Sequence, residues 1–168
     1  MATRRSVPAL LLALLALGAA AGPASAARAT TPRCATSGLV VWLDTQGDGA
    51  AGSVFYRLRF TNLTSRACTL TGFPGVSAVD LRGRQLGSPA ERDRTTAVRT
   101  VRVGAGATVS SVLRIVQAAN FPAARCRQTM AAGLRVYPPN QTASKIVPFP
   151  FRACSRSGPI FLQVRAVR

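Results

Sequence analysis

Arginines are the side chains of this sequence best suited to chemistry, and that chemistry is the binding of anions. The chain carries 22 Lys and Arg residues against 5 Asp and Glu residues, which gives a formal net charge of +17. A surface with this balance attracts polyanions. Several arginines alternate with apolar residues along expected strands, and this alternation directs them outward. The candidates for a polyanion-binding surface are Arg57, Arg59, Arg102, Arg114 and Arg135.

The alternative is that these arginines only solvate an outer face, since net charge reports on association and not on a specific ligand. Arg165 points outward by the same alternation. If several of these side chains share one sheet, they form a positive face, whereas a division between sheets makes the field diffuse. The sequence leaves this open because it gives neither strand order nor register.

Carboxylates are the only other groups that offer catalysis. The chain has no His, which excludes a His general base and a Ser-His-Asp triad. Glu91 and Asp93 are close together, but Arg92 and Arg94 beside them favour the ionised form, which is a poor general acid. We therefore expect no enzyme and no cofactor, with a His-free carboxylate hydrolase as a minor alternative.

Two further acids stand in a glycine-rich segment, residues 44–52, which we expect to be a turn-rich loop. Asp44 and Asp48 could contribute to a calcium site, but the segment lacks the density of oxygen ligands that calcium requires. Solvated turn residues are the better interpretation, because Asp commonly stabilises turns. We expect no metal site.

Four cysteines, an even number, indicate two disulfides in an exported chain. They are Cys34, Cys68, Cys126 and Cys154, and three pairings are possible. We favour the sequential pairing, Cys34 with Cys68 and Cys126 with Cys154, in which each bond closes a local loop. A zinc site would need clustered cysteines or His ligands, and neither is present.

A candidate ligand loop follows the strand expected at residues 134–137. Tyr137 and Asn140 are its candidate binding residues, because an amphipathic ring at a strand end is common at binding surfaces. The structural alternative is a turn, in which Pro138 and Pro139 end the strand and Asn140 bonds local backbone. Two segments match the N-glycosylation pattern, Asn62-Leu63-Thr64 and Asn140-Gln141-Thr142.

The elements that position these groups are short strands with regularly spaced turns. Residues 54–60 alternate clearly, with Arg57 and Arg59 opposite Tyr56 and Leu58. We expect Trp42 to lie in the core, and residues 120–130 to be irregular. Eight or nine strands of this kind predict an all-β, immunoglobulin-like β-sandwich with two disulfides. The candidates for these strands are ten segments, residues 39–43, 54–60, 68–70, 76–81, 85–87, 98–103, 108–116, 134–137, 145–147 and 160–167.

The N-terminus has the form of a secretory signal peptide. A basic start with Arg4 and Arg5 precedes a short apolar run that ends in Ala24-Ser25-Ala26. We expect cleavage after residue 26, a linker at residues 27–33 and one domain at residues 34–168. An uncleaved membrane anchor is the alternative, and the basic pair does not distinguish general from twin-arginine export.

Several segments together resemble one family, the actinobacterial secreted family called domain of unknown function 4232. The most specific segment surrounds Cys68 and reads C-T-L-x-G-x-P-G-V. The resemblance runs from about Arg33 to Val167, and implies export, an envelope setting and a β-sandwich. Many members look like lipoproteins, whereas this chain lacks the lipid-attachment Cys. The further matching segments are Cys34, residues 52–62, 67–77, 85–87 and 133–140, and Cys154-Ser155.

These observations lead to one expected function and two alternatives. We expect a secreted, non-enzymatic binding module of the actinobacterial cell envelope, which contacts an anionic wall polymer or an envelope protein through an Arg-rich surface. Specific nucleic-acid binding is not expected, and neither is a transmembrane segment after signal cleavage. A structural or protein-contact domain without a ligand is the alternative from a different class.

Overall fold

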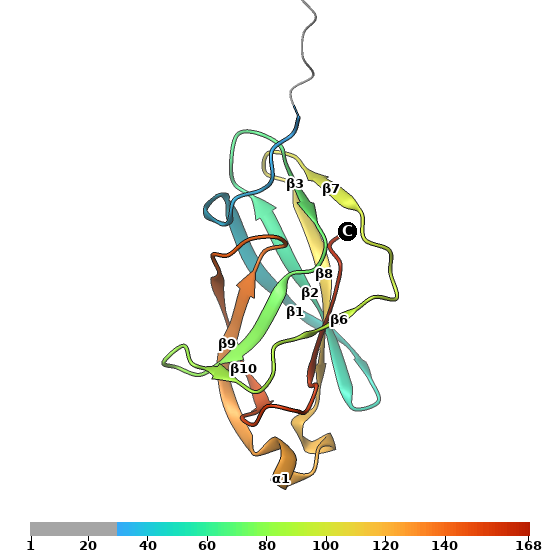
Figure 1. The fold of residues 1–168 in the computed structure, drawn as a ribbon, viewed down its shortest axis with the longest axis vertical. Helices are drawn as coiled ribbons and strands as arrows, with labels where there is room; N and C mark the ends of the chain where they lie inside the picture. The colour runs from blue at the N-terminus through green and yellow to red at the C-terminus, as the bar shows by residue number, and fades with distance from the viewer. Residues whose placement is uncertain (1–29) are drawn as a thin grey trace, which may run out of the picture.

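A computed structural model describes residues 30–168, so the predicted signal peptide, residues 1–26, lies outside the described part of the chain. Its largest sheet has five strands in the order β1-β2-β8-β11-β6, and only the β11–β6 pair is parallel (Figure 1). The strands are β1 (Leu39–Ala50), β2 (Ser53–Asn62), β6 (Glu91–Asp93), β8 (Thr108–Val116) and β11 (Leu162–Arg165).

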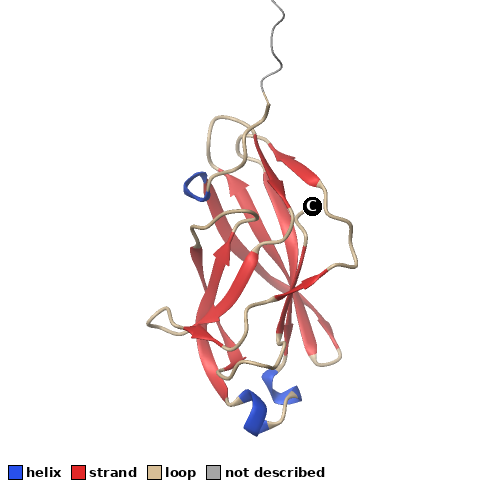
Figure 2. Ribbon diagram, viewed as in Figure 1, coloured by secondary structure: helices blue, strands red, loops and turns tan. Residues whose placement is uncertain are grey.

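A four-stranded antiparallel sheet, in the order β10-β9-β4-β5, faces the first sheet, and strands dominate the described chain (Figure 2). Its strands are β4 (Gly75–Val79), β5 (Gln85–Leu86), β9 (Gln128–Tyr137) and β10 (Lys145–Cys154). A separate pair consists of β3 (Cys68–Thr71) and β7 (Thr100–Val103). The helical segments are η1 (Thr36–Gly38), η2 (Ala118–Asn120) and α1 (Ala123–Cys126).

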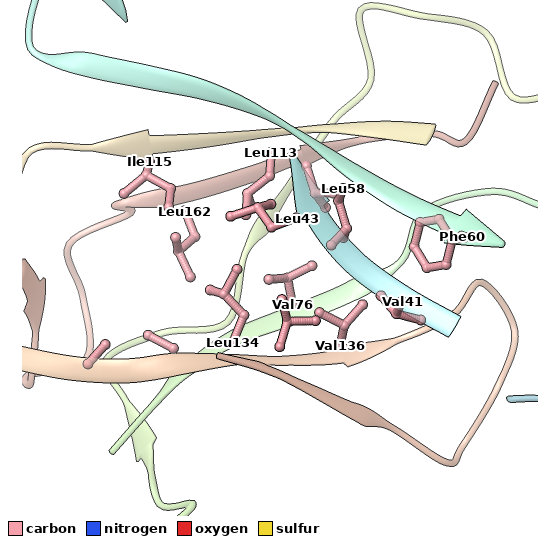
Figure 3. Packing of buried hydrophobic residues seen from close by; sticks show 14 of the residues in the cluster. Val41, Leu43, Leu58, Phe60, Val76, Leu113, Ile115, Leu134, Val136 and Leu162 are labelled. Carbon is pink, nitrogen blue, oxygen red and sulfur yellow. The ribbon is translucent and has the colours of Figure 1, made fainter. Parts of the chain in front are cut away.

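The core lies between the two larger sheets, where apolar side chains from both layers point toward one another (Figure 3). On β2 the alternation places Leu58 and Phe60 inward, and both are fully buried. Leu134 and Val136 approach them from β9. Burying a large apolar side chain contributes about 1.5–3 kcal/mol, so this layer is the main source of stability.

The all-β prediction with two disulfides is confirmed. The bonds join Cys34 to Cys68 and Cys126 to Cys154, which is the sequential pairing favoured from the sequence. The first bond fixes the start of the domain to β3, and the second fixes the end of α1 to the end of β10. Order extends into the expected linker, because Pro32 accepts a backbone hydrogen bond from Thr69.

Two expectations about β1 are wrong. Residues 44–50 are strand and not loop: Asp44 pairs with Arg57, Asp48 pairs with Phe55, and a register shift between the two acids absorbs the extra residues. Only residues 51–52 form the turn, where Gly52 has a φ of 70°. Trp42 is 41% exposed, because it lies between the inward-facing Val41 and Leu43 and therefore points outward.

The acidic segment between the strands expected at residues 85–87 and 98–103 is also a strand. Glu91 and Asp93 belong to β6, where they pair with Gln163 and Arg165 of β11. Both acids therefore join the edge of the five-stranded sheet. In the described part of the chain, no helix is long and apolar enough to cross a membrane.

Candidate functional site

The outer face of the five-stranded sheet collects several of the predicted arginines. Arg57 and Arg59 lie on β2, Arg114 on β8 and Arg165 on β11, all opposite the core-facing positions. Cross-strand pairing sets Arg59 beside Trp42, and Arg114 beside Phe55. Three of the five candidates from the sequence, Arg57, Arg59 and Arg114, are thus brought to one face.

Most of these guanidinium groups are held by neighbours on the same face. Arg59 donates from Nη2 to Oδ2 of Asp44 at 2.9 Å and lies 5.4 Å from the centre of the Trp42 ring. Arg114 donates to Ser53 Oγ at 3.0 Å and to Gln163 Oε1 at 2.9 Å. These contacts order the arginines and reduce their freedom to meet a ligand.

Carboxylates balance the charge of this face. It carries Asp44, Asp48, Glu91 and Asp93, which are four of the five acidic residues of the chain. Hydrogen bonds from Thr95 and Arg165 lower the pKa of Asp93 to about 2. Asp93 is therefore ionised at neutral pH and bound to an arginine, an arrangement that does not suit a general acid.

The hydrogen bond from Arg59 lowers the pKa of Asp44 in the same way. A shallow hollow of about 250 Å³ lies on this face, between Arg57, Arg165 and Arg168 and over Phe55. Even with Arg168 included, five arginines meet four carboxylates. The sheet face is therefore close to neutral, and the excess positive charge of the chain lies elsewhere.

The two remaining candidates are not part of the sheet face. Arg102 is exposed on β7, where it pairs with Thr69 of β3. Arg135 is on β9 and donates to the backbone carbonyl of Gly83, so that it supports the turn between β4 and β5. The structure does not bring these two side chains together with the other three.

Part of the unbalanced charge lies at the α1 end of the domain, opposite β3 and β7 (Figure 1). The Cys126–Cys154 disulfide brings two arginine pairs together there, and all four side chains belong to exposed residues. We call this group the basic end. It consists of Arg125, Arg127, Arg152 and Arg156.

Hydrogen bonds hold together the two backbone segments that carry the basic end. Ser155 donates from its backbone N–H and from its hydroxyl to the carbonyl of Arg127, at 3.1 and 2.8 Å. Arg156 donates from its backbone N–H to the Cys126 carbonyl at 3.2 Å, and from Nη1 to the Ala124 carbonyl at 3.2 Å.

No acidic side chain neutralises the basic end. The ion pairs of residues 30–168 are Asp44–Arg59, Asp80–Arg84 and Asp93–Arg165, and none involves this group. Sequence reasoning missed the site because it considered only arginines that alternate on strands. The available signal was R-C-R at residues 125–127 and R-x-C-x-R at residues 152–156, combined with the favoured disulfide pairing.

The candidate ligand loop has both structural and surface features. Asn140 has a φ of 59° and donates from Nδ2 to the Thr71 carbonyl at 3.0 Å, which fits the turn interpretation. Tyr137 is half-buried and lies against Gly75, where an added Cβ would come within 3.5 Å of its ring. A polar hollow of about 300 Å³ joins Tyr137 and Asn140 to Arg92. The loop therefore borders a hollow, and its asparagine also stabilises the fold.

A comparison of the sequence with known protein families gives a match. The family described as domain of unknown function (DUF4232) matches residues 34–167, which is most of the chain. The chain belongs to this family. No curated protein matches the DUF4232 chain.

The structure also shows where two other candidates from the sequence lie, the glycosylation pattern at Asn62 and the calcium candidate Asp44. Asn62 of the first glycosylation pattern is fully buried, and its amide is hydrogen-bonded to three backbone carbonyls. It is therefore inaccessible in the folded domain. Asp44, proposed above as a turn residue, is bound to Arg59, and the described residues contain no group of three potential metal-ligating side chains.

Proposed function

We propose that this DUF4232 chain is a secreted, non-enzymatic binding module of the actinobacterial cell envelope, and that it binds an anionic wall polymer through the basic end. One observation carries the proposal: four exposed arginines are clustered around a disulfide, with no carboxylate paired to them. The site therefore differs from the sheet face, where Asp44 and Asp93 are paired with Arg59 and Arg165.

Arginine is suited to this task because its planar guanidinium binds phosphate and carboxylate groups with two parallel hydrogen bonds. The backbone that carries these arginines is held by hydrogen bonds, so it loses little conformational freedom on binding. The signal-like N-terminus and the two disulfides support an oxidising, exported setting for such contacts. The engagement of Asp93 by Arg165 supports a non-catalytic role.

The test compares two variants with equal charge loss. In the first, Arg125, Arg127, Arg152 and Arg156 become Ser, and in the control Arg57, Arg59, Arg114 and Arg165 become Ser. Oxidised domain is co-sedimented with cell walls that contain or lack their anionic polymer, across a salt series. We expect the first variant to lose about tenfold or more in affinity, with a flatter salt dependence, because exposed charges are screened by salt.

The control variant should keep most of its affinity, because Arg59 and Arg165 are paired with carboxylates and Arg114 is held by Ser53 and Gln163. Melting temperatures of both variants check that the fold survives. Equal losses in the two variants would mean that binding follows net charge and not the basic end. Equal binding to cell walls that contain and that lack the anionic polymer would contradict the proposal altogether.

The sheet face supports a second candidate, a contact surface for a partner protein. Trp42 and Val40 are each 41% exposed beside the ordered Arg59, and Trp and Arg are enriched at protein interfaces. This surface is charge-balanced, so its binding would depend little on salt. Loss of a protein partner on Trp42→Ala, with polymer binding intact, would separate this role from the basic end.

A further inference from the structure

An apolar cavity of about 260 Å³ lies next to the basic end, and the proposed function does not use it. One wall is the inner face of the five-stranded sheet, with Val54, Tyr56 and Ile115. The opposite wall is β10, which contributes Phe149 and Phe151. The cavity thus occupies one opening between the two layers of the sandwich.

An irregularity in the backbone of β10 directs Phe149 and Phe151 into this opening. The register with β9 shifts between Pro148 and Phe151, and such bulges redirect side chains. Gly133 of β9 permits the shape, since a Cβ there would come within 2.4 Å of the Val147 carbonyl oxygen. Phe149 then meets Tyr56 edge to face, with 5.0 Å between ring centres.

The lining leaves the rings only partly covered. Tyr56, Phe149 and Phe151 pack against the core but are not fully buried, although burial of aromatic rings is favourable. The hairpin arm of β1 packs against Tyr56, where an added Cβ on Gly47 would approach the ring to 2.8 Å. The volume exceeds the roughly 150 Å³ of an apolar cavity that binds benzene. There is therefore room for a ring or a short alkyl chain.

The mouth of the cavity is cationic. Arg152 lines it and is also a member of the basic end, so a ligand with an apolar tail in the cavity would hold its head beside arginine. No carboxylate of the described chain pairs with this arginine. The complementary ligand has an alkyl chain and a negative head group.

We propose that this cavity binds the alkyl chain of a single-chain anionic amphiphile, such as a fatty acid, with its head group at Arg152. The apolar walls would release ordered water when the chain enters, and the guanidinium would bind the carboxylate. Binding of the alkyl chain is independent of polymer binding, because the chain contacts the apolar walls and the polymer contacts the arginines. An uncharged chain of the same length should therefore also enter the cavity, with lower affinity.

The test is calorimetric titration of the oxidised domain with octanoate and with octanol, at low salt. We expect saturable, one-to-one binding of both, with octanoate about two- to fivefold tighter, the range expected for a charge contact at an exposed rim. Arg152→Gln should remove this difference and leave octanol unchanged. Arg102→Gln, with the same loss of charge on β7, is the matched control and should change neither affinity.

Two variants fill the cavity. Val54→Phe adds a ring to one wall, and Ala119→Phe does so from an exposed position on η2, so that one remains informative if the other fails to fold. Each should abolish binding of octanoate and octanol while polymer co-sedimentation stays at the wild-type level. Absence of saturable binding by either probe, or unchanged binding in a folded filling variant, would overturn the proposal. Equal octanoate affinity in Arg152→Gln and wild type would overturn the placement of the head group.

Discussion

The substitution Asn62→Ala tests how the loops at one end of the sandwich are held. Asn62 ends β2, is fully buried, and donates from Nδ2 to three carbonyls, those of Arg66 at 2.8 Å, Val103 at 3.2 Å and Gly104 at 3.0 Å. Its Oδ1 accepts hydrogen bonds from the backbone N–H and the hydroxyl of Thr64, at 3.0 and 2.7 Å. One amide therefore joins three segments of the chain.

The structure sets the size of the effect. The Val103 carbonyl contact is buried, and a buried acceptor without a donor costs about 1–3 kcal/mol. The Arg66 and Gly104 contacts are only part-buried, so water replaces some of the loss, and each adds about 0.5–1 kcal/mol. We therefore expect Asn62→Ala to lower the free energy of unfolding by about 2–5 kcal/mol.

The assay is urea unfolding, followed by fluorescence of Trp42, the single tryptophan of the chain. The matched control is Asn120→Ala, because Asn120 also donates from Nδ2 to a backbone carbonyl, that of Gly52 at 2.8 Å, but at an exposed position. The control should lose less than about 1 kcal/mol. Equal losses of unfolding free energy in the two variants would refute the reasoning. So would an unfolding free energy of Asn62→Ala that lies within about 0.5 kcal/mol of the wild-type value.

Three further outcomes are expected. Replacing Cys126 and Cys154 by Ala should lower the free energy of unfolding by about 3–4 kcal/mol and also weaken polymer binding, measured by urea unfolding and co-sedimentation. Hydrogen bonds from Thr95 and Arg165 lower the pKa of Asp93 from its ordinary value of 3.8 to about 2, so they stabilise the fold above about pH 4. That contribution, about 0.2–1 kcal/mol, should disappear as the pH falls from about 4 to 2, and Asp93→Asn should lack this dependence in acid titrations. Acrylamide should quench Trp42 readily in the folded domain, because the ring is 41% exposed, and weak quenching would contradict its outward placement.

The sequence predicts the all-β class because alternation reports directly on which face of a strand is buried. On β2, Leu58 and Phe60 are inward and Arg57 is outward, as expected. Alternation was hidden where apolar residues are consecutive: in Val40-Val41-Trp42-Leu43 both faces of β1 carry apolar side chains. The outward position of Trp42 follows only from pairing with β2, which the sequence does not reveal.

The long arm of β1 was missed for a related reason. Gly47 and Gly49 are unfavourable in strands, so composition predicts a loop there. In the fold, the partner strand β2 supplies the ladder, and Gly47 lies so close to Tyr56 that a larger residue would collide with the ring. The glycine is present because of a contact that is remote in sequence, and local propensity cannot express such a contact.

The distribution of charge depends on topology even more than on composition. All five acidic residues precede residue 94, so the C-terminal part of the chain is purely basic, and only strand order decides which arginines are neutralised. Parallel pairing of β6 with β11 sets Asp93 against Arg165, and pairing of β1 with β2 sets Asp44 against Arg57 and near Arg59. No strand that carries an acidic residue pairs with the segments of the basic end. Among the arginines that alternation marked as binding residues, Arg59 is therefore paired with a carboxylate, while those beside the second disulfide have no acidic partner.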